Sequence, residues 1–313
     1  MRIIGKSLRV AFGETLAQLG AENDKIVALD ADLANATQSK FFRDAFPERF
    51  FDMGIAEANM VDTAAGLAHD GFIPFVSTFA LFGTGRAYEQ IRNSVAYENL
   101  NVKFALSHSG LSVGEDGGSH QSVEDIALMR VMPNMNVIVP ADPKETEKAI
   151  RAAVEIDGPV YVRVGRPVVE DVPELDDKPF EFGKATIVKD GSDAAIIACG
   201  LMLTRALEAA KQLEAEGIST AVINMHTIKP IDADTILKYN DKVKAMVTME
   251  EHSIIGGLGS AVAEVLAGHA GAKFSRIGIN DVFGQSGTPD SLFEEYGLTA
   301  EHAVTDIKNL LSK

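Results

Sequence analysis

The stretch RFFDMGIAEANMVDTAAGLAHDGFIPFVS, residues 49–77, decides the fold because it holds a strand, a helix and a second strand in succession. Residues 49–53 and 72–77 are short apolar runs typical of buried strands. Residues 56–71 between them carry small and apolar side chains at helical spacing. This order predicts a βαβ unit, in which the helix connects two parallel strands of one sheet.

The same alternation continues on both sides of this unit. Other short apolar runs lie between helical stretches, at residues 25–30, 102–106, 136–140 and 159–164. We therefore expect α/β architecture with two open, mainly parallel-sheet domains. The first domain covers residues 1–166. Residues 167–185 are rich in proline and acid and indicate a linker, and a second, smaller domain covers residues 186–313.

Composition and charge narrow the possible partners. The chain has 313 residues, of which 46% are hydrophobic, so each domain can bury a core. Acidic residues outnumber basic ones by 45 to 29, and the charge of −16 repels nucleic acid and anionic lipid. No apolar run approaches the roughly 20 residues that span a bilayer. We expect no nucleic acid and no membrane partner.

Two features bear on location. Residues 1–20 carry charged side chains within their apolar pattern, which indicates an amphipathic helix and not an export signal. Cys199 is the only cysteine and lies in an apolar run, so burial is expected and a disulfide is not. A cytoplasmic protein is consistent with both features.

Polar and aromatic residues follow the predicted strands, at the edge where open parallel sheets bind ligands. They are Asp30, Asp32, Glu57, Thr78, Phe79, Ser107, His108 and Arg166. Loops are polar in most proteins, but a domain with only a structural role does not need this cluster. We predict an active site at this edge.

The densest ionisable segment is LSHSGLSVGEDGGSHQSVEDIALMR, residues 106–130. His108, Glu115, Asp116 and His120 lie there among glycines, which let the backbone fold closely around a small ligand. Imidazoles beside carboxylates can also transfer protons near neutral pH. A solvated loop with surface histidines is the alternative. A metal site is a weaker one, because no H-x-x-x-H or C-x-x-C spacing is present.

Glu57, Phe79 and Phe82 each have a simple structural explanation. An acid in a first helical turn opposes the helix dipole, and two aromatics one turn apart commonly pack in a core. Glu57, however, follows a strand and has apolar neighbours on both sides, where shielding from water suits a proton donor. The aromatic pair would also suit a platform for a flat heterocycle.

In combination these segments resemble the transketolase family, in order and over nearly the whole chain. The matching motifs are GIAE at 54–57, TFALF at 78–82, SH at 107–108 and GEDGGSHQ at 114–121, of which the last is highly specific. The resemblance implies a pyrimidine-binding domain for thiamine diphosphate, followed by a transketolase C-terminal domain. It also implies transfer of a two-carbon ketol unit between phosphorylated sugars.

The resemblance gives each matching residue near the cofactor a role. Glu57 would bind N1′ of the aminopyrimidine ring and promote the tautomer that activates thiamine diphosphate. Phe79 and Phe82 would stack on this ring, and Asp32 would lie near the cofactor. His120 would sit beside the ring's amino group, and both Glu57 and His120 would be catalytic.

Other matching residues would bind the substrate. His108, also expected to be catalytic, would meet the donor sugar near its reacting carbons, and Asp116 would recognise its C2 hydroxyl. Arg166 and Arg9 would bind the sugar phosphate, and Thr37 would be a further phosphate contact.

The chain departs from the family pattern at three places. Gly85 stands where a third aromatic is usual, so the pyrimidine pocket is expected to be more open or filled from elsewhere. ANAT at 34–37 replaces the usual serine. GIAEANM at 54–60 looks more like deoxyxylulose-phosphate synthases and 2-oxoacid dehydrogenase β subunits, whereas His108 favours transketolase, because the synthases carry arginine there.

The Gly-Asp-Gly motif that binds Mg²⁺ and diphosphate in this family, followed by an asparagine, is missing from the sequence. We therefore expect no metal ligands on this chain and a separate N-terminal transketolase subunit that supplies them, in an α2β2 assembly. Two alternatives stay open. One is a synthase-like or 2-oxoacid dehydrogenase β-like subunit, and the other is a non-catalytic assembly or regulatory subunit.

Overall fold

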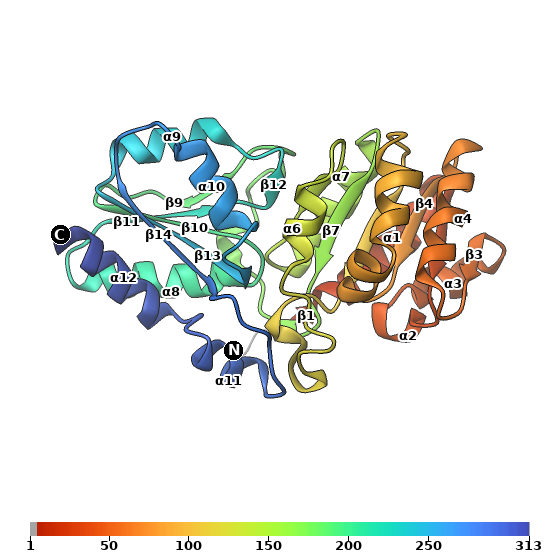
Figure 1. The fold of residues 1–313 in the computed structure, drawn as a ribbon, viewed down its shortest axis with the longest axis horizontal. Helices are drawn as coiled ribbons and strands as arrows, with labels where there is room; N and C mark the ends of the chain where they lie inside the picture. Colours follow the sequence, from red (N-terminus) through yellow and green to blue (C-terminus); the bar gives the residue numbers. More distant parts are fainter. Residues whose placement is uncertain (1–4, 313) are drawn as a thin grey trace.

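The computed structural model describes residues 5–312 and shows two α/β halves side by side (Figure 1). The predicted fold class is confirmed. A seven-stranded sheet in the first half has the order β12-β6-β7-β5-β4-β2-β3, and only the β12–β6 pair is antiparallel. Its strands are β2 (Ile26–Asp30), β3 (Phe50–Asp52), β4 (Ile73–Ser77), β5 (Lys103–Ser107), β6 (Asn136–Ile138), β7 (Val160–Val164) and β12 (Thr227–Lys229).

Helices cover both faces of this sheet, because successive strand residues point to opposite faces and both sets are apolar. In β2, Ile26 and Ala28 pack in one core with helices α1 (Leu8–Glu22) and α7 (Pro143–Glu155). Val27 and Leu29 pack in another with α4 (Glu57–His69) and α6 (Asp125–Arg130). The shorter helices are α2 (Ala34–Thr37), α3 (Lys40–Ala45) and α5 (Tyr88–Gln90). Polar groups are thereby confined mainly to the strand ends.

A five-stranded sheet in the second half has the order β14-β13-β10-β11-β9, with only β9 antiparallel. Its strands are β9 (Thr186–Lys189), β10 (Ala194–Ala198), β11 (Thr220–Asn224), β13 (Ala245–Ser253) and β14 (Lys273–Ile279). The helices of this half are α8 (Met202–Ala215), α9 (Ala233–Lys242), α10 (Leu258–Leu266), α11 (Pro289–Glu295) and α12 (Ala300–Ser312).

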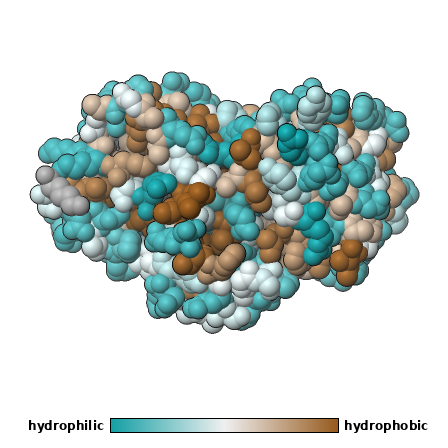
Figure 2. All heavy atoms as spheres, viewed as in Figure 1, coloured by the Kyte–Doolittle hydropathy of each residue, from teal (hydrophilic) through white to brown (hydrophobic). Residues whose placement is uncertain are grey.

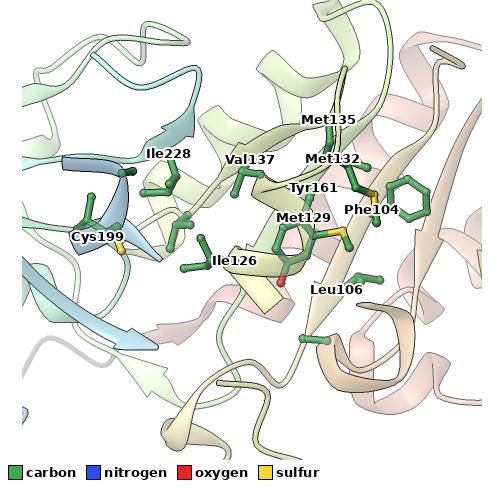
Figure 3. Packing of buried hydrophobic residues seen from close by; sticks show 14 of the residues in the cluster. Phe104, Leu106, Ile126, Met129, Met132, Met135, Val137, Tyr161, Cys199 and Ile228 are labelled. Carbon is green, nitrogen blue, oxygen red and sulfur yellow. The ribbon is translucent and has the colours of Figure 1, made fainter. Parts of the chain in front are cut away.

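The two halves interlock. Strand β12 lies beyond the predicted linker in sequence but belongs to the first sheet. One apolar core also runs through both halves, and Figure 3 shows Met129 and Tyr161 of the first in the same cluster as Cys199 and Ile228. Cys199 is buried, as expected. The proposed domain boundaries stay a prediction, and the sheets themselves do not divide at one point of the chain.

A short antiparallel pair closes the first half. Strand β1 (Lys6–Ser7) pairs with β8 (Val168–Val169), so that the start of α1 lies next to the end of β7.

Figure 2 shows polar residues over much of the visible face, with apolar residues interspersed. Among residues 5–312 no helix is both long and apolar enough to cross a membrane.

Candidate active site

Glu57 is the first residue of α4 and is only 1% exposed. Its Oε1 accepts a hydrogen bond from Nη1 of Arg86 at 2.6 Å. Its Oε2 is buried and has no hydrogen-bond partner among the residues that the structure describes. A buried polar atom without a partner is costly, so this oxygen is an acceptor that a ligand would satisfy.

Arg86 is a site residue that the sequence analysis missed. It ends the π-helical segment Phe82–Arg86, and its guanidinium lies 4.9 Å from the ring centroid of Phe82. About half of the side chain is exposed, at 51%, whereas its partner Glu57 is buried. The sequence contained a signal for it, because Arg86 follows Phe82 by four residues and residues so spaced share a helix face. Arg86 therefore joins the carboxylate to the aromatic pair.

Four rings gather at the carboxyl end of the sheet, and Arg86 links one of them, Phe82, to Glu57. Phe79 and Phe82 stack with centroids 5.6 Å apart, as their spacing predicted. His108 stacks on Phe79 at 3.8 Å, and His120 meets Phe82 edge-on at 5.3 Å. An isolated bridge between Phe79 and Ser107 aligns the segment that follows β4 with the end of β5. The rings thus form one wall, with faces or edges that a flat heterocycle can contact.

His108 has unusual backbone and electrostatic surroundings. Its φ of +59° is rare for a residue other than glycine, and the Oγ of Ser107 lies 2.9 Å from its Nδ1. Burial, together with the nearby Arg9 and Arg166, lowers the pKa of His108 to about 3. The ring is therefore neutral near pH 7. It is suited to hydrogen bonding with a substrate and not to cycling its own charge.

Two arginines lie close enough to act on the same histidine. Pairing of β1 with β8 brings Arg9 near Arg166, although they are far apart in sequence. Burial and Arg166 lower the pKa of Arg9, and its Nε is buried without a partner in the described part of the chain. Arg166 donates to the carbonyl of Val113 and lies 3.3 Å from a carboxylate oxygen of Glu115. Two adjacent guanidinium groups form a setting that favours a bound anion.

Three other predicted residues, Asp116, His120 and Asp32, are more exposed than Glu57 and His108. Asp116 is exposed on the loop segment Leu111–Asp116, and His120 is partly exposed with its Nδ1 2.9 Å from the Oγ of Ser119. Asp32 is exposed and has a φ of +61°. Its backbone N–H donates to a carboxylate oxygen of Asp52 at 3.1 Å.

Thr37 is not brought to the surface of this edge. Its side chain is fully buried, and its hydroxyl donates to Oδ2 of Asp30 at 2.8 Å. Ser39 donates to the same oxygen at 2.9 Å. Burial raises the pKa of Asp30 to about 6. Through the hydrogen bonds from Thr37 and Ser39, the Asp30 carboxyl group stabilises the loop that follows β2 from its buried side. The geometry does not support a phosphate contact by Thr37.

The site has the features of half a cofactor pocket. Glu57 and the aromatic pair fit an aminopyrimidine, because Glu57 offers an acceptor oxygen that has no partner among the described residues, and Arg86 links its carboxylate to the stacked pair through Phe82. Among residues 5–312, no three His, Cys, Asp or Glu side chains are grouped so as to hold a metal ion. A cavity of about 800 Å³ lies between α6, β12 and α10, and none of the candidate site residues named above lines it.

Comparison with known proteins gives two family matches. The transketolase pyrimidine-binding domain matches residues 5–171, and the transketolase C-terminal domain matches residues 183–303. A solved structure described as a split-gene transketolase, an inactive beta4 tetramer, is 50% identical with a TM-score of 0.89. The similarity covers 98% of this chain and 99% of that one.

Two curated relatives differ in how much of their own length this chain matches. A 6-deoxy-6-sulfo-D-fructose transketolase subunit of Clostridium sp. (strain MSTE9) is 42% identical over 96% of this chain and 95% of its own. A 1-deoxy-D-xylulose-5-phosphate synthase of Geobacter sulfurreducens is 41% identical over 92% of this chain, but only 46% of the synthase is covered.

Proposed function

The chain belongs to the transketolase family, and from this premise we propose that it is one subunit of a two-chain transketolase that uses thiamine diphosphate. It contributes the pyrimidine-binding and C-terminal domains. The observation that carries the proposal is Glu57, whose Oε2 is buried with no partner in the described part of the chain and whose ion-pair partner Arg86 lies over Phe82 of the stacked aromatic pair.

Glu57, Phe79 and Phe82 would hold the aminopyrimidine end of the cofactor. Bound thiamine diphosphate supplies the electron sink that cleavage of a carbon–carbon bond beside a carbonyl requires. Glu57 would hydrogen-bond the ring nitrogen through Oε2, where one proton can move between the carboxyl group and the ring, and would keep Oε1 on Arg86. The ring wall excludes water on one side and orients the heterocycle, while His120 lies at its edge.

The diphosphate end requires Mg²⁺ and oxygen ligands, which we assign to a partner chain. The sequence has no Gly-Asp-Gly motif for this purpose, and the described residues hold no grouped ligands. The related split-gene transketolase is described as an inactive beta4 tetramer, which supports the need for a second kind of chain. An α2β2 enzyme is the arrangement that we propose.

The substrates that we propose are phosphorylated sugars, between which a two-carbon ketol unit is transferred. Arg9 and Arg166 would bind the phosphate, since both lie at the same edge of the sheet as His108. His108, held neutral by burial, would accept or donate a hydrogen bond at the reacting end of the sugar, and Asp116 would contact a hydroxyl. The Clostridium relative also acts on a sugar with an anionic end, by its name.

Deoxyxylulose-phosphate synthesis is the second candidate, and 41% identity to a synthase supports it. Both reactions can be assayed on one preparation. The chain would be co-expressed with a partner that carries the Gly-Asp-Gly motif and supplied with a ketose phosphate and an aldose phosphate. We expect two-carbon transfer by the complex. Efficient condensation of pyruvate with a triose phosphate would instead favour the synthase, and inactivity of the complex towards every donor would favour an assembly subunit.

A further inference from the structure

We propose that the C-terminal domain holds the active-site loop, residues 110–121, in its working shape through two clamps, Glu251 on β13 and the segment 284–287. The catalytic meaning of these clamps rests on the function proposed above. The clamps themselves are contacts between the two halves of the chain. Glu251 and Gln121 are positioning residues in this scheme, because they act on the substrate through the loop.

The first clamp joins Glu251 to the start of the loop. Its Oε2 accepts a hydrogen bond from the backbone N–H of Ser112 at 3.1 Å, and its Oε1 accepts one from the hydroxyl of Ser112 at 3.2 Å. Gly110 passes so close that a Cβ there would lie 2.4 Å from Oε2. Gly110 also has a φ of +74°, which glycine adopts without strain. The loop backbone is therefore shaped around this carboxylate.

Arg163 fixes the carboxylate in turn. It lies on β7, is 3% exposed, and its Nη1 is 3.6 Å from Oε1 of Glu251. Its Nη2 donates to the Glu251 carbonyl at 3.2 Å, while its Nε donates to Oδ2 of Asp125 at 2.7 Å. A buried carboxylate is tolerated when it is paired and hydrogen-bonded. The network explains why Glu251 can point out of its own domain into the other.

The second clamp contacts the C-terminal end of the loop through Gln121. Gln121 donates from Nε2 to the carbonyl of Gly114 at 3.1 Å and to that of Gln285 at 2.9 Å. A Cβ on Gly284 would lie 1.8 Å from Oε1 of Gln121, and a Cβ on Gly118 would lie 2.5 Å from the carbonyl oxygen of Gly284. The two backbones thus touch with no space for a side chain between them.

Between the clamps lie Asp116, which is proposed to contact the substrate, and His120, which is proposed to lie beside the cofactor. Val113 gives its carbonyl to Arg166, and Glu115, Asp116 and His120 follow. The loop contains four glycines, whose backbones have many accessible conformations, so holding the loop in one conformation costs much conformational entropy. Contacts from a separate domain at both ends reduce that freedom without occupying the open side of the site.

Amide hydrogen exchange on the full chain tests the clamps without partner or substrate. Glu251→Gln replaces one acceptor oxygen by an N–H₂ group, which cannot accept from the Ser112 N–H or from Arg163. Gly284→Ala forces Gln121 to move. We expect each to speed exchange of amides 110–121 by about tenfold or more. The matched control is Glu250→Gln, the adjacent buried carboxylate, which caps α10 within its own domain through Leu258 N at 2.7 Å and Gly259 N at 2.8 Å.

Kinetics on the reconstituted complex add a second readout. We expect Glu251→Gln and Gly284→Ala to lower kcat/KM for the sugar donor about tenfold while the Kd for thiamine diphosphate changes less, since Glu57, Phe79 and Phe82 lie outside the loop and His120 is its one proposed cofactor contact. If Glu251→Gln does not fold, Ser112→Ala removes one bond of the same clamp from the loop side. Unchanged loop exchange in the folded variants, or an equal rise in Glu250→Gln, overturns the clamps. Faster loop exchange in a complex with no transferase activity upholds the clamps and refutes the proposed function.

Discussion

Glu57 and Arg86 form an ion pair in which one carboxylate oxygen is used and the other is left free. Oε1 of Glu57 lies 2.6 Å from Nη1 of Arg86, and Oε2 is buried with no partner among residues 5–312. The arginine also stacks on Phe82. One interaction therefore fixes the orientation of the carboxylate and connects it to the aromatic wall.

Glu57→Gln should leave the fold intact and lower kcat of the reconstituted enzyme by about 100-fold or more, because an amide has no ionisable proton to supply. Turnover with saturating donor and cofactor is the measurement. Glu98→Gln, on an exposed turn, is the control. Near wild-type turnover of Glu57→Gln would remove Glu57 from catalysis.

Arg86→Met should weaken cofactor binding by the complex about tenfold, because Glu57 loses the charged partner that orients it. Arg86→Lys keeps the charge but not the planar group over Phe82, and an intermediate loss is expected. Calorimetry with thiamine diphosphate and Mg²⁺ measures both variants. Equal affinity in all three proteins would mean that Arg86 has no part in the pocket.

His108 should make the isolated chain sensitive to acid. Its pKa is about 3 in the folded chain against an ordinary 6.5, so the unfolded chain binds this proton more readily. Its contribution is present above pH 6.5 and is lost as the pH falls from there towards 3. His108→Gln should reduce the pH dependence of the unfolding free energy by at most about 1.4 kcal/mol per pH unit. Urea unfolding at fixed chain concentration gives the slopes. The exposed His269→Gln is the control, and an equal change in both would contradict the assignment.

Removing either Arg9 or Arg166 should raise KM for phosphorylated sugars about tenfold or more and spare hydroxypyruvate, which has no phosphate. Substitution by methionine keeps most of the side-chain length. Arg151→Met is a suitable control, because Arg151 forms a surface ion pair with Glu22. Equal losses for both substrate types would indicate that the arginines act on the structure of the site and not on the phosphate.

The chain without its partner should show no transketolase activity at any concentration of thiamine diphosphate and Mg²⁺. Its binding of the cofactor should be weak and insensitive to chelation of Mg²⁺, because stacking and one hydrogen bond contribute only a few kcal/mol before association entropy is subtracted. Adding the partner should restore tight binding and activity together, and EDTA should then abolish both. Calorimetry before and after the addition tests this, and tight Mg²⁺-dependent binding by the chain alone would refute it.

Local patterns in the sequence were sufficient for the fold class and for placing most of the candidate residues at one edge of the first sheet. Strand and helix periods are set by neighbouring residues, so the run from RFFDM to FIPFVS predicts β3, α4 and β4. Parallel strands in one sheet bring their carboxyl ends to one edge, so the sequence predicted that Glu57, Phe79 and His108 lie together, and Phe79 and His108 do stack.

Only the tertiary structure decided which of these side chains are free to act. Thr37 looked like a phosphate contact but is held by Asp30, and Arg86 looked unremarkable but pairs with Glu57. Strand β12 joined the first sheet, and Glu251 reached the loop of the other domain. Each outcome depends on which distant groups are close enough to pair when the apolar cores pack. The sequence by itself determined the periods of strands and helices and the types of side chain available. The pairing of buried polar groups across the fold was decided by tertiary packing, because burial makes an unpaired polar group costly wherever its partner lies in the chain.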